Sequence, residues 1–346
     1  MALPLGARRV IRPALLALAF VTAPAAFAQD VPAGTEVTAP GPEGDLAGTL
    51  VDPDPRAPLL LIVPGSGPTD HDGNNRYGIA GGPYRQLAEA LAKRGVATLR
   101  IDKRGMFGSK AAFANANQAT ITAYAQDMRS WIDAARKRTG RRCVWLGGHS
   151  EGGLVVLAAA QNPEGVCGVV LIGAAGRPLA TIMREQFRAN PANAPFLDSA
   201  LKMIDAFEAG KHIDSASLAQ PLPQLFPDSV QDFLIDEFRY DPTRLAAALK
   251  VPLLVAQGDQ DVQINPGDAQ ALAGANPSAK LAIIPGMTHV LRIAEGEGFA
   301  ASTATYGNAA LPVAPALADA IAGFVTAKRW FRPAPRRAGG RGAGHL

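Results

Sequence analysis

The sequence predicts an α/β protein in which helices cover both faces of a mostly parallel sheet. Short apolar runs alternate along the chain with segments that carry apolar residues at helical spacing. A composition with 48% hydrophobic and 18% charged residues is that of a folded chain. Because consecutive strands joined through a helix cross over with one handedness, they become parallel neighbours in one sheet.

The elements expected in the first half follow this alternation. Two short strands, separated by a turn rich in Pro and Gly, open the domain, and a buried run of Leu, Ile and Val then begins the regular pattern. Each expected helix shows an apolar stripe. The expected strands are 36–39, 45–51, 59–63, 96–101, 144–147 and 166–172, and the expected helices are 84–93, 121–135 and 154–160.

The alternation pauses between residues 177 and 250, and this pause predicts an inserted helical cap. Only helical patterns occur there, at 199–209, 229–240 and 242–249, before the alternation resumes with strands 252–256 and 281–284 and helices 268–273 and 314–327. The α/β core is therefore assigned to 29–176 and 251–327. Six apolar cap residues either line an acyl pocket or pack against the sheet: Met203, Ile204, Phe207, Phe233, Leu234 and Phe238.

The first 28 residues have the pattern of a secretory signal peptide. Residues 1–12 carry three arginines and no acid, 13–23 are largely apolar, and Ala26-Phe27-Ala28 supplies small residues for cleavage. A membrane anchor needs about 20 continuous apolar residues, and this run has roughly half of that. We therefore expect a periplasmic or secreted protein that begins at Gln29 and has no stable membrane insertion.

The formal charge of +4 comes from the two ends of the chain. Three of the 34 Lys and Arg residues precede position 29, and six follow position 327. The 25 that remain are outnumbered by the 30 Asp and Glu residues. A weakly acidic body disfavours a nucleic-acid partner. The basic tail, 328–346, consists mostly of residues with little to bury and is expected to be disordered, with attraction to an anionic surface as its functional alternative.

The chain has two cysteines, Cys143 and Cys167. Each begins a short apolar run and lies seven residues before its end, at Ser150 and Ala174 respectively. Two neighbouring parallel strands would place the cysteines side by side, and an exported protein meets an oxidising compartment. The sequence leaves open one disulfide or two buried thiols.

A serine lies in the context of a nucleophile elbow. Gly148-His149-Ser150-Glu151-Gly152 joins an expected strand to an expected helix, and the two glycines allow strand and helix to approach closely. Ser150 is the candidate nucleophile. The alternative is a glycine-rich turn that happens to contain a serine.

A base and an orienting acid are needed to activate a serine hydroxyl. Suitable residues follow in the order serine, acid, histidine, on loops after later strands: Asp261 follows strand 252–256, and His289 follows strand 281–284. Asp259 is the rival acid. It comes directly after Gly258 and is better suited to shaping the turn.

Two backbone amides are needed to bind the negative charge that develops on a substrate carbonyl oxygen. The amide of Glu151 is the first expected donor. The second comes from the loop 64–68, with Ser66 preferred and Gly67 as the alternative. Pro68 is excluded because it has no amide hydrogen.

These motifs resemble the α/β-hydrolase superfamily, and within it the bacterial serine hydrolases related to the serine aminopeptidase and monoacylglycerol-lipase-like group, some of which are carboxylesterases. The resemblance spans about 45–327 and implies an eight-stranded sheet, a helical lid, a triad of Ser150, Asp261 and His289, and hydrolysis of acyl esters without a cofactor. The chain departs from the family at His71, where arginine is usual, and near Met106-Phe107, where a small polar residue is usual. The matching segments are 64–70, 72–74, 102–105, 148–152, 257–261 and 288–291.

The sequence thus predicts an exported serine hydrolase that cleaves small carboxylic acyl esters through an acyl-enzyme. A serine aminopeptidase or a thioesterase would use the same residues, and a non-catalytic binding protein on this fold is a third alternative. We expect no metal and no cofactor, because the chain lacks a His-Glu-x-x-His motif and a Cys or His cluster at ligand spacing, and 147–150 lacks the ending of a P-loop. The expected partner is a small acyl substrate.

Overall fold

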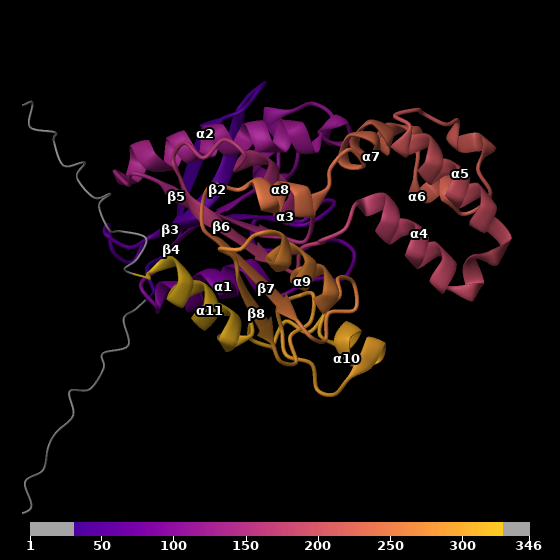
Figure 1. Ribbon diagram of the computed structural model, residues 1–346. Helices are drawn as coiled ribbons and strands as arrows, with labels where there is room; N and C mark the ends of the chain where they lie inside the picture. The colour runs from indigo at the N-terminus through magenta and orange to yellow at the C-terminus, as the bar shows by residue number, and fades with distance from the viewer. Residues whose placement is uncertain (1–30, 328–346) are drawn as a thin grey trace, which may run out of the picture.

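A computed structural model of the chain describes residues 31–327 (Figure 1), so the signal peptide predicted at 1–28 and the tail predicted at 328–346 lie outside the described residues. An eight-stranded sheet with the order β1-β2-β4-β3-β5-β6-β7-β8 forms the centre. Only β2 runs antiparallel to its neighbours, β1 and β4, which confirms the predicted mostly parallel sheet. The strands are β1 (Thr35–Pro40), β2 (Asp45–Val51), β3 (Leu59–Val63), β4 (Ala97–Ile101), β5 (Val144–His149), β6 (Val166–Ile172), β7 (Leu253–Gly258) and β8 (Lys280–Ile284).

The strand order reverses at β3, which pairs with β4 on one side and with β5 on the other. Beyond the carboxyl ends of β3 and β5 the two connections leave in opposite directions, so a crevice opens between them. The loop that begins at Pro64 follows β3, and Ser150 follows β5. The topology therefore brings these two candidate segments to one edge of the sheet.

Two apolar cores lie on opposite faces of the sheet. One face is covered by α2 (Ile121–Thr139), α3 (Glu151–Ala159), α8 (Pro242–Ala248) and α9 (Pro266–Ala275), and the other by α1 (Pro83–Ala92) and α11 (Pro315–Val325) (Figure 1). Strands β3, β4, β5 and β6 are buried on both faces, which is why they read as continuous apolar runs.

The cap helices α4–α7 form a third apolar cluster and stand away from the sheet in Figure 1. They are α4 (Leu179–Ala189), α5 (Leu197–Glu208), α6 (Leu222–Leu225) and α7 (Gln231–Glu237). Helix α8 falls within the expected cap range of 177–250, but it packs against α3 and α9 of the core, with Ala246 fully buried there. The expected packing against the sheet was wrong for five of the six apolar residues, because they are buried in the cap's own cluster: Met203, Ile204, Phe207, Leu234 and Phe238.

Three α-helices were not expected from the sequence. Helix α4 opens the cap, the short helix α6 lies within it, and α10 (Gly298–Ala304) lies between β8 and α11. Helix α10 has mostly small residues, and Phe299 is exposed, so it lacks the apolar stripe by which a buried helix is recognised. None of the helices in the described part of the chain combines the length and apolar character needed to cross a membrane.

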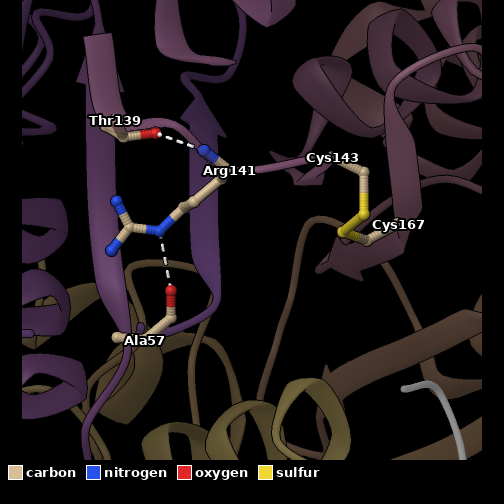
Figure 2. Close-up of a disulfide and its surroundings, with 5 residues drawn as sticks. All are labelled: Ala57, Thr139, Arg141, Cys143 and Cys167. Carbon is tan, nitrogen blue, oxygen red and sulfur yellow. Dashed lines mark hydrogen bonds between the residues drawn. A yellow bond between two sulfur atoms is a disulfide. The ribbon is translucent and has the colours of Figure 1, made fainter. Parts of the chain in front are cut away.

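A disulfide joins Cys143 and Cys167 at the start of the neighbouring strands β5 and β6 (Figure 2). The two strands run parallel, so the start of one lies beside the start of the other, as the spacing predicted. Two residues before Cys143, Arg141 donates from Nε to the carbonyl oxygen of Ala57 at 2.7 Å. The structure therefore selects one disulfide over two thiols.

Replacing both cysteines by alanine is expected to lower the free energy of unfolding by about 3 kcal/mol, because the bond closes a 24-residue separation in the unfolded chain. Denaturant unfolding with and without dithiothreitol measures this. The reductant should lower the stability of the wild type and leave that of the double variant unchanged. Two titratable thiols in the denatured, unreduced protein would contradict the pairing.

Candidate active site

Ser150 adopts a backbone conformation that only a closely packed turn enforces. Its φ is 53° and its ψ is −123°, and its amide donates to the carbonyl oxygen of Ile172 on the adjacent strand at 3.0 Å. A Cβ on Gly148 would lie 2.1 Å from the Gly152 carbonyl oxygen, and a Cβ on Gly152 would lie 2.5 Å from that of Val63. Both glycines are therefore steric requirements of the turn that lifts Ser150 above the end of β5.

His289 and Asp261 are joined by a hydrogen bond of 2.8 Å between Nδ1 and Oδ2. Both side chains are buried. Because a carboxylate only accepts, Nδ1 carries the proton, and Nε2 is left as the free nitrogen. This is the tautomer in which an imidazole can take a proton at Nε2.

The Asp261 carboxylate is held by further donors. It accepts from Gln257 Nε2 at 3.1 Å and from the amides of Gln263 and Ile264 at 2.8 and 3.0 Å. Burial alone would raise the pKa of Asp261, but the charge and hydrogen bond of His289, with the two amides, outweigh it and hold the pKa below its usual value. The acid is therefore kept ionised beside the imidazole.

The rival acid, Asp259, has a different contact. Its Oδ1 accepts from the amide of Gly286 at 2.6 Å, which ties the loop after β7 to the loop after β8. The structure thus brings Asp261 to His289 and leaves Asp259 in a turn.

Ser150 and His289 line one cavity of about 240 Å³, together with Ser66, Tyr84 and Tyr306. Within residues 31–327 the Ser150 hydroxyl has no hydrogen-bond partner. Nucleophile and base are often separated in the absence of substrate and close only in its complex. The shared cavity, rather than a formed bond, places the two groups together.

The loop after β3 brings backbone amides to the same place. Ser66 lines this cavity and two others beneath the cap, beside Ser150 and Glu151. Glu151 opens α3, and the first amides of a helix have no acceptor within it. The amide of Gly65 is already used, because it donates to the Tyr84 hydroxyl at 3.3 Å. Ser66 and Gly67 therefore remain the loop's candidate donors.

A buried pair, Tyr84 and His149, connects three loops of the site. His149 Nε2 lies 2.8 Å from the carbonyl oxygen of His289, so Nε2 carries the proton, and Nδ1 accepts from the Tyr84 hydroxyl at 2.7 Å. Burial, with the nearby His289, lowers the pKa of His149 to about 3 and keeps the ring neutral. The sequence did not reveal this contact, since Tyr84 and His149 lie 65 positions apart.

A second buried group lies under the cap. Lys103 Nζ is 2.9 Å from Glu151 Oε1. Glu237 of α7 lines the two cavities beneath the cap that Glu151 also borders. Only 7% of Glu237 is exposed, yet in the described part of the chain no hydrogen bond or ion pair reaches its carboxyl group. Burial and the neighbouring Glu151 raise the pKa of Glu237 well above its usual value, against the effect of Lys103. The sequence did not reveal this contact, since Lys103 and Glu151 lie 48 positions apart.

The two departures from the family pattern lie outside the cavity that Ser150 and His289 share. His71 Nδ1 is 3.1 Å from Asp102 Oδ2, and a hydrogen bond with Asp102 raises the pKa of His71. Met106 and Phe107 border the wide opening between core and cap, together with Tyr77 and Leu225. Among residues 31–327 there is no group of three His, Cys, Asp or Glu side chains arranged to hold a metal ion.

Sequence comparisons agree with this architecture. Residues 74–218 match the family model described as serine aminopeptidase, S33. The biotin biosynthesis bifunctional protein BioHC of Cellvibrio japonicus is 26% identical over 173 residues, which are 46% of this chain and 34% of that protein. The chain therefore spans about a third of the length of this curated relative.

Solved structures show the same fold. A hydrolase from Pseudomonas aeruginosa PA01 has 20% sequence identity and a TM-score of 0.52, with 86% of this chain and 100% of that chain covered. A serine hydrolase from Cycloclasticus zankles has 20% identity and a TM-score of 0.52, with 84% and 98% covered. An eight-stranded, mostly parallel sheet with a helical cap and an elbow after β5 is the α/β-hydrolase fold. The chain has this fold, as its sequence motifs predicted.

Replacing Glu237 by glutamine is expected to stabilise the fold increasingly as the pH rises. A carboxyl group whose pKa is raised on folding contributes stability at acid pH and loses it as the pH passes from the usual carboxyl range through the folded pKa. Glutamine has no such proton to lose. Thermal unfolding should therefore show a difference in Tm, variant minus wild type, that grows between about pH 4 and pH 8. A difference independent of pH would contradict the buried, titrating carboxyl.

Proposed function

We propose that this protein is a serine hydrolase that cleaves small carboxylic acyl esters through an acyl-enzyme. One observation carries the proposal: Ser150, held at a strained elbow, shares a cavity with an imidazole whose Nδ1 is bound to Asp261. Nucleophile, base and orienting acid come from the ends of three different strands, β5, β8 and β7. This combination matches the requirements of acyl transfer.

In the proposed reaction, Ser150 Oγ attacks the ester carbonyl carbon while His289 Nε2 takes the hydroxyl proton. The carbon–oxygen bond to the alcohol breaks, and the alcohol leaves with that proton. Water then attacks the acyl-enzyme, gives its proton to His289, and the acid is released as Ser150 recovers its hydrogen. Asp261 keeps the imidazole in one tautomer throughout.

The amides of Ser66 and Glu151 are the proposed donors to the oxyanion, with Gly67 as the alternative to Ser66. Ser66 and Ser150 border the same cavities, and the Glu151 amide follows Ser150 directly at the start of α3. The positive end of the α3 dipole adds to this field.

Separate spaces are present for the two parts of an ester. One cavity, of about 240 Å³, lies beside Tyr84, His289 and Tyr306. Another, of about 310 Å³, lies beneath the cap and is bordered by apolar residues that include Phe233 and Leu234. Volumes of this size support a small acyl group and a small alcohol.

A serine aminopeptidase is the second candidate, because one observation favours it. Glu237 is a buried carboxyl without a partner among the described residues, and it lies with Glu151 on the cap-side cavities next to Ser150. A substrate ammonium group would provide the missing partner. Thioester hydrolysis would use the same triad, but no contact distinguishes it.

Export is also part of the proposal. The N-terminal pattern is that of a signal peptide, and the Cys143–Cys167 disulfide suits an oxidising compartment.

Ser150→Ala is expected to abolish turnover of p-nitrophenyl acetate by residues 29–327, and Asp261→Asn to lower kcat about 10⁴-fold, because the amide favours the wrong tautomer of His289. Asp259→Asn serves as the matched control and should stay within about tenfold of the wild type. A larger loss in Asp259→Asn than in Asp261→Asn would overturn the assignment of the acid.

Comparison of p-nitrophenyl acetate with alanine p-nitroanilide separates the two candidate functions. We expect the ester to be the better substrate in kcat/KM, because no amine is needed to place it. An anilide preferred by the wild type, together with a loss of at least about tenfold for the anilide alone in Glu237→Gln, would establish the aminopeptidase instead.

A further inference from the structure

Lys103 is a buried cation, and its ammonium group contacts segments on both sides of the nucleophile. Only 3% of the residue is exposed. Its Nζ donates to the Gly65 carbonyl oxygen at 2.8 Å and to Glu151 Oε1 at 2.9 Å, and it lies 5.2 Å from the centre of the Tyr124 ring. Burying an ammonium group is costly, and an apolar pair of similar volume often stabilises a fold equally well. The two oxygen contacts indicate what this cation does.

The first contact acts on one peptide unit. The Gly65 carbonyl and the Ser66 amide belong to the same trans peptide bond, so they point in opposite directions. A charged donor on the carbonyl oxygen therefore fixes the amide on the far side, and it draws electron density away from the nitrogen. Ser66 borders the cavity that holds Ser150 and His289.

The second contact acts on Glu151, at the start of α3. Glu151 follows Ser150, and its amide is the second proposed donor to the oxyanion. The ion pair with Lys103 fixes the Glu151 side chain at the start of α3. One ammonium group is thereby bound to both segments that supply oxyanion donors.

Gly65 is fixed from its other side as well. Its amide donates to the Tyr84 hydroxyl, which in turn donates to His149 beside Ser150. Both polar groups of the Gly65 backbone thus have buried partners, and the following amide, that of Ser66, is left for a ligand.

We propose that Lys103 is a positioning residue of the oxyanion hole: it holds and polarises the Gly65–Ser66 peptide and fixes Glu151, so that the two amides are in place before the substrate binds. The inference rests on the proposed serine hydrolase function. It assigns to Lys103 no contact with substrate and no proton transfer. Its effect increases as negative charge develops on the carbonyl oxygen, so it acts on the transition state more than on the bound ester.

The test uses a variant in which no buried charge is left without its ion-pair partner. Lys103→Met alone would leave the Glu151 carboxylate buried next to Glu237, so the variant is Lys103→Met/Glu151→Gln. The matched control is the neighbouring buried ion pair, Arg104→Met/Asp127→Asn. In the wild type, Arg104 Nη2 lies 2.6 Å from Asp127 Oδ1, and Arg104 has no contact with Gly65.

For each protein, a fluorophosphonate counts the reactive Ser150 sites, p-nitrophenyl acetate gives kcat and KM per site, and phenylboronic acid, which forms a tetrahedral adduct on the serine, gives Ki. In the Lys103 variant, kcat should fall about ten- to a hundredfold with KM nearly unchanged, which is less than the loss expected for deleting a whole donor. The Ki should rise by the same factor as kcat/KM falls. The control should keep both constants within about threefold of the wild type.

Failure of the inference and failure of the proposed function would give different results. A Lys103 variant with fewer titratable sites but wild-type kcat and Ki at each remaining site would show a structural role only and overturn the inference, as would a control that loses as much as the variant. A wild type in which Ser150 neither labels nor turns over ester would overturn the proposed function, and the inference with it.

Discussion

The site depends on the close approach of β5 and α3 at Ser150. The turn between them gives Ser150 a positive φ, and the space for it exists only because neither Gly148 nor Gly152 has a side chain. This strain is maintained by the strands on either side: β5 pairs with β3 and β6, and the Ser150 amide is bound to Ile172. The buried strands β3, β5 and β6 therefore determine where one hydroxyl group lies.

The other parts of the site are loops, and buried polar side chains hold them. Arg292, fully buried, donates to the carbonyl oxygens of Thr305 and Ala80, which joins the loop carrying His289 to two distant segments. Gln257 binds both Asp261 and the carbonyl oxygen of Ile264. Such groups are costly to bury unless each has partners, and once bonded they leave a loop little freedom. The loops of the candidate site are therefore held in place before any ligand binds, which is the preorganisation that the proposed function requires.

The cap has a different character from the core. Its own apolar cluster holds α4–α7 together, while the cavity surface that it shares with the core combines apolar side chains with Lys103, Glu151 and Glu237. Under the proposed function, the side chains on this shared surface would contact the acyl group. We therefore expect substrate preference to depend on how these few buried charges are partnered, more than on the triad.

The strands could be predicted from the sequence because they are short, apolar on both faces and regularly separated by helices. Six of the eight were expected with at least one boundary as observed: β2, β3, β4, β5, β6 and β8. Asp261 and His289 were expected on neighbouring loops, and the structure joins them by a hydrogen bond, although their catalytic roles stay predictions.

What the sequence did not reveal are contacts between residues far apart in the chain. The bonds from Tyr84 to His149 and from Lys103 to Glu151 depend on how loops cross the edge of the sheet, which no local pattern encodes. In the cap, a helical stripe could not show that Phe233 and Leu234 border the cavity while Phe207 lies only in the apolar cluster. Short or small-residue helices such as α10 were not predicted, because they bury few side chains and so show no apolar stripe.

The most direct measurement of the central claim is mass spectrometry of the protein quenched in acid during turnover of p-nitrophenyl acetate. If Ser150 is the nucleophile, part of the protein will carry one acetyl group, fragmentation will place it on Ser150, and the adduct will disappear when the substrate is exhausted. Turnover without any adduct, with wild-type activity retained in Ser150→Ala, or with the acetyl group on another residue, would contradict the account.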